Sequence, residues 1–217
     1  MDARQDLSED TATPGELIEL ADWRRRVVEG YADVRRAADP RAAWDEWCQL
    51  RADLFLHHPQ SPFAVDARRP DRLPEYSDYD ARYRVLAGVV TVDTASRVEL
   101  PTSRGTTMAA TVAGRAVFEL DGTAVQLELY WLEGYAGGLL LPFRDATNGR
   151  TTYGSGRYLL DTAKGADLGV IADHLVLDFN FAYQPSCSYH ESWSCPLPPR
   201  ANWLPIDVPV GERTRRY

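Results

Sequence analysis

The chain has 217 residues, of which 44% are hydrophobic and 26% are charged. This composition is typical of a soluble globular protein and excludes an intrinsically disordered one. The formal net charge of −8 argues against nucleic acid as the main partner, because binding to phosphates requires a basic surface. No run of about 18 apolar residues is present, so the sequence predicts no membrane partner.

The N-terminal residues 1–12 are acidic and contain no apolar signal region. They predict a disordered tail on a cytoplasmic protein. In a reducing compartment the three cysteines, Cys48, Cys187 and Cys195, would be free thiols. Residues 13–217 are expected to form a single domain, because the length leaves no room for two full ones. The oligomeric state is left open.

Residues 13–58 predict a helical hairpin. Thr13 and Glu16 have the spacing of a capping box, and apolar residues then recur every three or four positions over about 14–38. The dipeptide Asp39-Pro40 ends this helix and begins a second, with the aspartate as its cap.

From residue 80 to 195 the pattern changes to short β-rich runs separated by Gly, Asp or Ser. The dipeptide Asp121-Gly122 lies between two alternating segments, which is the strongest local signal for a hairpin. The fold class predicted is α+β, with an antiparallel β-barrel-like or sandwich core and the helical hairpin packed on it. The proline-rich segment 196–217 is expected to wrap the surface. The strands are predicted at 83–93, 96–101, 107–113, 116–120, 125–131, 138–144 and 175–183.

Two arginines stand beside turn glycines. Arg144 and Asp145 precede the turn Asn148-Gly149, and Arg157 follows a Gly-Ser-Gly sequence. Glycines let backbone amides approach an anion closely, and arginine offers a planar fork to a carboxylate or phosphate. The alternative is a hairpin corner in which Arg144 pairs with Asp145 or Asp178 and has no ligand.

Asp178 and Asn180 fall on one face of the last predicted strand. That face either meets water or lines a polar cavity. Neighbouring acid and amide groups suit general acid–base chemistry, and they equally suit a network that closes a loop. We expect both residues and Tyr153 to share a polar cleft with Arg144 and Arg157, which would favour an anionic or strongly polar small molecule.

Cys187 and Cys195 are eight residues apart, with His190 between them. Cys-x2-His-x4-Cys would give zinc three ligands at a non-standard spacing and no obvious fourth, so no metal is predicted. A disulfide closing this small loop is an alternative. The favoured interpretation is that these three residues secure the loop.

Unusual residues are spread over about 20–212. They are Trp23, His58-Pro59-Gln-Ser-Pro62, Tyr130-Trp-Leu-Glu-Gly-Tyr135, Phe143-Arg-Asp-Ala-Thr147, Gly149, Tyr153-Gly-Ser-Gly-Arg-Tyr158, Asp178-Phe-Asn180, Tyr183, Pro185, Cys187, Tyr189 and Cys195-Pro196. Together they resemble the prokaryotic family catalogued as domain of unknown function 1684. The resemblance implies no activity.

Three functions are compatible with the sequence. The first is a small-molecule enzyme of open reaction class, built from 143–158 and 178–195. The second is a non-catalytic binder of a small polar or anionic molecule in a cleft of the β-core. The third is a structural or protein-interaction module with no small-molecule site. No cofactor is predicted, because Gly154-Ser-Gly156 lacks the third glycine and the helix of a dinucleotide fingerprint.

Overall fold

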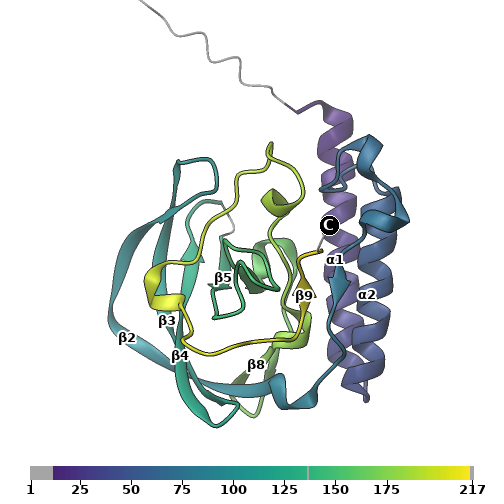
Figure 1. Ribbon diagram of the computed structural model, residues 1–217. Helices are drawn as coiled ribbons and strands as arrows, with labels where there is room; N and C mark the ends of the chain where they lie inside the picture. Colours follow the sequence, from purple (N-terminus) through teal and green to yellow (C-terminus); the bar gives the residue numbers. More distant parts are fainter. Residues whose placement is uncertain (1–11, 136, 216–217) are drawn as a thin grey trace, which may run out of the picture.

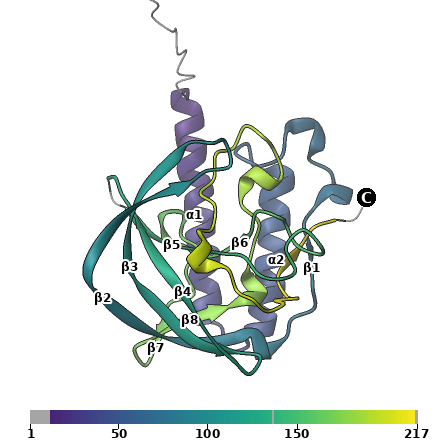
Figure 2. The same ribbon diagram turned by 60° about the vertical axis from the view of Figure 1, so that its left-hand side comes forward.

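The computed structural model describes residues 12–135 and 137–215. The predicted acidic tail therefore lies outside the described residues, except for Ala12. Two helices come first, α1 (Pro14–Arg36) and α2 (Pro40–His57), and they run side by side on one flank of a curled sheet (Figures 1 and 2). In the described part of the chain, neither is long and apolar enough to cross a membrane.

The caps predicted for the hairpin are confirmed. Thr13 Oγ1 accepts a hydrogen bond from the Glu16 amide at 3.3 Å, and the Glu16 carboxylate accepts one from the Thr13 amide at 2.7 Å. Asp39 Oδ1 accepts from the amide of Arg41 at 2.9 Å and starts α2. These side chains satisfy amides that have no partner within the first helical turn.

The described residues form a seven-stranded antiparallel sheet in the order β6-β5-β4-β3-β2-β8-β7. It curls into a half-barrel on which the helices pack, so the predicted α+β class is confirmed (Figure 1). A separate pair, β1 and β9, joins the loop after α2 to the end of the chain. The strands are β1 Glu75–Tyr76, β2 Arg84–Pro101, β3 Thr107–Leu120, β4 Thr123–Leu132, β5 Gly138–Phe143, β6 Arg157–Asp161, β7 Val170–Ile171, β8 His174–Asp178 and β9 Glu212–Arg213.

Two pairs of predicted strands are single long strands in the structure. β2 joins 83–93 to 96–101 through a register shift between Thr91 and Ser96, and β3 continues through Gly114. At Gly114 a Cβ atom would lie 2.9 Å from the carbonyl oxygen of Val90, so a side chain would force the strands apart there. The polar and glycine residues that suggested breaks therefore mark irregularities within strands.

The predicted strand 175–183 is wrong beyond Asp178. Asp178 Oδ1 accepts a hydrogen bond from the amide of Asn180 at 3.0 Å and starts the 3-10 turn Phe179–Phe181. This local bond competes with the strand ladder, as short polar side chains commonly do. The expected alternation of Asp178 and Asn180 on one strand face is therefore absent.

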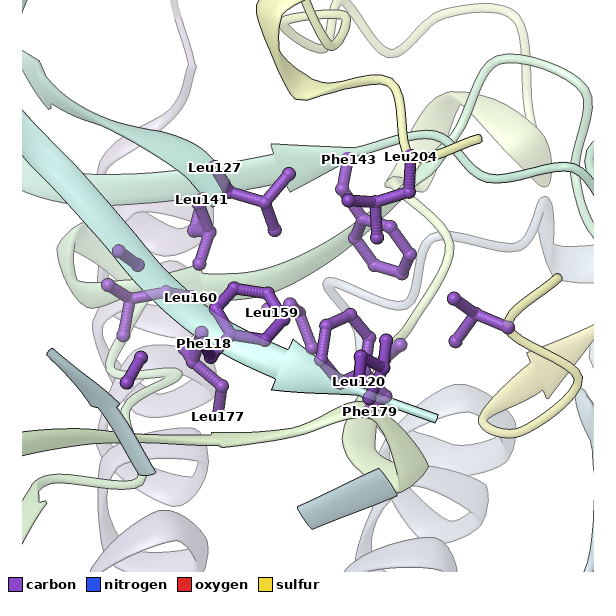
Figure 3. Packing of buried hydrophobic residues seen from close by; sticks show 14 of the residues in the cluster. Phe118, Leu120, Leu127, Leu141, Phe143, Leu159, Leu160, Leu177, Phe179 and Leu204 are labelled. Carbon is purple, nitrogen blue, oxygen red and sulfur yellow. The ribbon is translucent and has the colours of Figure 1, made fainter. Parts of the chain in front are cut away.

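The main core lies in the hollow of the curled sheet. Figure 3 shows its side chains pointing toward one another, among them Phe118 and Leu127 from strands and Phe179 from the 3-10 turn after β8. The segment after residue 196 crosses the open side of this hollow and adds Leu204 and Val208 to the core, so it does more than wrap the surface (Figures 1 and 2).

A second aromatic cluster joins the helices to the sheet. The ring centroids of Trp47 and Phe181 are 5.0 Å apart, and Trp44 Nε1 donates to the carbonyl oxygen of Asn180 at 2.9 Å. The 3-10 turn after β8 is thus the surface on which α2 packs.

Candidate functional site

Arg157 and Asp145 form a buried ion pair that holds the C-terminal segment. Arg157 Nη2 lies 2.9 Å from Asp145 Oδ2 and also donates to the carbonyl oxygen of Val208 at 2.8 Å, while Nη1 donates to that of Val210. The Arg157 side chain has no exposed surface. Both Nη atoms bond to groups of its own chain, although the buried Nε has no hydrogen-bond partner among the described residues. A buried charge requires partners, and here the C-terminal segment and Asp145 supply them.

Asp178 and Asn180 form another closed network. Asp178 Oδ2 accepts from the Tyr79 hydroxyl at 3.1 Å, and Oδ1 accepts from Asn180 Nδ2 at 2.8 Å. The Asp80 amide donates to Asn180 Oδ1, and Asn180 Nδ2 donates to the carbonyl oxygen of Asp80, each at 2.9 Å. Both residues attach the segment before β2 to the end of β8.

Arg144 and Tyr153 belong to neither of these two networks. The guanidinium carbon of Arg144 is 4.1 Å from the centroid of the Trp203 ring, a cation–π contact. Burial, and next the charge of the neighbouring Cys187 thiol, raise the pKa of the Tyr153 hydroxyl. The expected convergence of Arg144, Arg157, Asp178, Asn180 and Tyr153 on one polar cleft is therefore wrong, because their partners belong to separate networks.

A different pocket lies between the helical hairpin and the sheet. We call it the helix–sheet pocket. It has a volume of about 70 Å³, and its walls come from α1, α2, β6, the turn after β6 and residues 183–189. Its lining includes Tyr31, Arg51, Phe55, Lys164 and Tyr183.

One buried hydrogen-bond donor in this lining has no acceptor in the described part of the chain. The Tyr31 hydroxyl is buried and has no hydrogen-bond partner among the described residues. The indole of the neighbouring Trp47 carries an N–H donor and no acceptor. It can face the Tyr31 oxygen but cannot accept the phenolic proton. Arg51 also lines the pocket, and it donates from Nε to the Tyr76 hydroxyl at 2.8 Å and from Nη2 to Glu212 Oε2 at 3.0 Å.

Both cations of the pocket are paired with buried carboxylates. Arg51 Nη2 lies 3.0 Å from Glu212 Oε2, and Lys164 Nζ lies 2.9 Å from Asp161 Oδ2. The Lys164 side chain is half-exposed, and its ammonium has two further N–H groups. The lining is therefore rich in donors but nearly neutral in net charge.

Three aromatic rings surround Arg51 and fix its position. Its guanidinium carbon is 4.9 to 5.1 Å from the ring centroids of Trp47, Phe55 and Tyr183.

Burial raises the pKa of the Tyr31 and Tyr183 hydroxyls far above the ordinary value. These tyrosines stay protonated at neutral pH, which suits hydrogen-bond donation and not proton abstraction.

A thiol pair lies beside this pocket, at the end of the segment that lines it. The amide of Cys187 donates to Cys195 Sγ at 3.4 Å, and the amide of Cys195 donates to Ser103 Oγ at 3.1 Å. Both cysteines are free. His190 is exposed, and its ring bonds to Ser192 Oγ at 2.7 Å. The described residues contain no group of three or more side chains placed to hold a metal ion.

Comparison with known proteins gives a family and related solved structures. Residues 72–213 match the family described as "Protein of unknown function (DUF1684)". The chain belongs to this family.

The resemblance seen in the DUF1684 sequence motifs is thereby confirmed. An uncharacterized protein of Haloarcula marismortui, solved by solution NMR, is 36% identical. The match covers 80% of this chain and 95% of that one, with a TM-score of 0.58. None of the curated proteins matches the chain.

The sequence interpretation did not name Arg51 and Lys164 as site residues, although each has an unusual feature in the sequence. Arg51 falls on the aromatic face of α2, between Trp47 and Phe55, where a charge is costly unless it has a buried partner. Lys164 is the only lysine among 24 basic residues.

Proposed function

We propose that the protein binds a small oxygen-rich molecule, such as a short carboxylate or an inorganic oxyanion, in the helix–sheet pocket. The observation that carries the proposal is the buried Tyr31 hydroxyl, whose proton has no acceptor. Leaving a buried donor unpaired costs about 1–3 kcal/mol, so a ligand oxygen that accepts this proton recovers that energy.

The neighbouring donors support the same class of ligand. The Arg51 guanidinium and the Lys164 ammonium line the pocket with Tyr31 and carry N–H donors on different walls. Charge-assisted donors of this kind form the strongest hydrogen bonds to carboxylate and phosphate oxygens. Because Glu212 and Asp161 already neutralise the two cations, recognition relies on hydrogen bonding more than on net charge.

The size of the pocket limits what it can enclose. An apolar cavity of about 150 Å³ can hold benzene, so the 70 Å³ here encloses a group of about three heavy atoms. Nucleotides and flavins need a cavity several times larger. We infer that a carboxylate or oxyanion head enters, and that any remaining part of the ligand extends outward past the half-exposed Lys164.

A thermal-shift titration tests the proposal. The melting temperature of the wild-type protein is measured in acetate, in phosphate and in chloride at the same ionic strength. We expect acetate or phosphate to raise it above the chloride value, because a ligand that binds only the folded state stabilises that state. We expect Tyr31→Phe and Lys164→Met to lose that increase.

Arg84→Met is the matched control. Arg84 is also a partly exposed cation next to a buried carboxylate, that of Asp178, but it does not line the pocket. Its variant should keep the wild-type response. If neither oxyanion stabilises the wild type beyond chloride, the pocket is not a ligand site. The alternative of a structural or protein-interaction module then stands.

A further inference from the structure

The Cys187 and Cys195 side chains have the arrangement of a dithiol that can form a disulfide bond reversibly. The amide of Cys187 donates to Cys195 Sγ at 3.4 Å, so the second sulfur lies against the residue that carries the first. Cys187 is partly exposed, whereas Cys195 is buried and 5% exposed. An external reagent can therefore reach the first sulfur more easily than the second.

The surroundings of the two sulfurs differ in a way that favours one as the nucleophile. Hydrogen bonding from the Cys195 thiol lowers the pKa of Cys187 to about 6, against an opposing effect of burial, and Ser103 and Tyr153 lower it further. The same bond, together with burial, raises the pKa of Cys195. At neutral pH Cys187 is then mostly thiolate, the form that attacks disulfides.

The loop that carries the pair is held at both ends. The carbonyl oxygen of Cys195 accepts from the amide of Ser103 at 2.9 Å, and the next residue, Pro196, forms an isolated bridge with Thr102. At the other end, Tyr183 exchanges backbone hydrogen bonds with Tyr158 of β6. The sulfurs are therefore kept together by the fold and not by a covalent bond.

We propose that Cys187 and Cys195 form a thiol–disulfide exchange site for low-molecular-weight disulfides, with Cys187 as the attacking sulfur and Cys195 as the resolving one. The inference is independent of the helix–sheet pocket, since it uses different side chains and a different chemistry.

The exchange takes two steps. The Cys187 thiolate attacks one sulfur of a small disulfide RSSR, forms a Cys187–SR bond and releases RS⁻. This removes the negative charge beside Cys195, whose thiol then ionises more easily and passes its proton to RS⁻. The Cys195 thiolate attacks Cys187 Sγ and releases a second RS⁻, which takes a proton from water. Overall, the protein dithiol is oxidised to a disulfide while RSSR is reduced to thiol.

Oxidised glutathione is the probe in the first experiment. The folded, reduced protein is exposed to it, free thiols are blocked with N-ethylmaleimide, and the products are read by intact mass and peptide mapping. We expect the wild type to lose two hydrogen atoms and to gain a Cys187–Cys195 link that reduced glutathione reopens. Cys195→Ser should retain one glutathione on Cys187, and Cys187→Ser should take up none.

A second measurement uses only the wild-type protein. It therefore tests the proposal even if the cysteine variants do not fold. Iodoacetamide alkylation of each cysteine in the wild type is followed against pH. The rate at Cys187 should reach half its maximum near pH 6, against about 8.5 for an ordinary thiol. Burial raises the pKa of Cys48 to about 12, so Cys48 serves as the slow internal reference.

The proposal is overturned by any of three results. In the first, Cys187 alkylates with an ordinary thiol midpoint. In the second, Cys195→Ser folds but captures no glutathione. In the third, the Cys187–Cys195 bond forms but does not reopen in reduced glutathione, which would make it a structural disulfide.

Discussion

The guanidinium Nη2 of Arg157 lies 2.9 Å from Asp145 Oδ2, and neither side chain has any exposed surface. Asp145 Oδ1 also accepts from the amides of Thr147 and Val208, at 2.8 and 3.2 Å. The pair therefore joins the turn after β5, the start of β6 and the C-terminal segment. Its role in this structure is to hold the segment that closes the core.

The first prediction compares two Arg→Lys substitutions. Arg157→Lys loses the planar fork that reaches Asp145 and two carbonyl oxygens, and breaking a buried pair costs about 3–5 kcal/mol. Arg144→Lys loses mainly a contact with Trp203 and should cost about 1 kcal/mol or less. Urea unfolding of both variants measures the difference. Equal losses would mean that the buried pair contributes no more than the surface contact.

The second prediction concerns the Tyr31 hydroxyl. Tyr31→Phe removes a buried donor that has no acceptor, so it should raise the free energy of unfolding by about 1 kcal/mol in the absence of ligand. Tyr130→Phe is the control, because the Tyr130 hydroxyl donates to Glu128 Oε2 at 2.8 Å and its loss should destabilise. Denaturant unfolding of both variants checks this. A destabilised Tyr31→Phe variant would show that the hydroxyl has a partner in solution.

The third prediction is a pH dependence at Asp178. Burial raises the pKa of this carboxyl, although hydrogen bonds from Asn180 and Tyr79 oppose the shift. A raised pKa means that the folded state binds the proton more tightly. The resulting stabilisation is complete below the unfolded pKa of about 3.9 and is lost as pH rises through the folded value. Relative to Asp178→Asn, the wild type should therefore be more stable at acidic than at neutral pH.

Asp80 provides the opposite control for this measurement. Hydrogen bonds from Arg82 lower the pKa of the Asp80 carboxyl, so its contribution is present above the unfolded pKa and is lost as pH falls. Urea unfolding of wild type, Asp178→Asn and Asp80→Asn across the acidic range should give slopes of opposite sign for the two substitutions. Slopes of the same sign would contradict the assignment for Asp178.

The fourth prediction concerns the sulfur of Cys187. Tyr153 lowers the pKa of this thiol by hydrogen bonding, so Tyr153→Phe should move the midpoint of Cys187 alkylation to higher pH. Tyr135→Phe is the control, because the Tyr135 side chain is fully exposed and should leave the midpoint unchanged. An unshifted midpoint in Tyr153→Phe would remove Tyr153 from the thiol site.

The elements that could be predicted from the sequence are those set by neighbours along the chain. The caps at Thr13 and Asp39 act within three residues, and both helices begin where these caps predict. Asp121 and Gly122 adopt positive φ values of 48° and 75° and close the β3–β4 hairpin as expected. Each depends on local hydrogen bonds or backbone sterics, which short sequence patterns encode.

The partners of the buried polar residues were decided only by the tertiary structure. Arg157 was correctly singled out as unusual, but its acceptors on Val208 and Val210 lie more than fifty residues away along the chain. Likewise, Arg51 on α2 meets Glu212 on β9 across 161 residues. A sequence pattern indicates that a charge needs a partner. Which distant segment supplies it depends on how the curled sheet, the helices and the C-terminal segment pack together, because long-range pairing is set by the shape of the whole core.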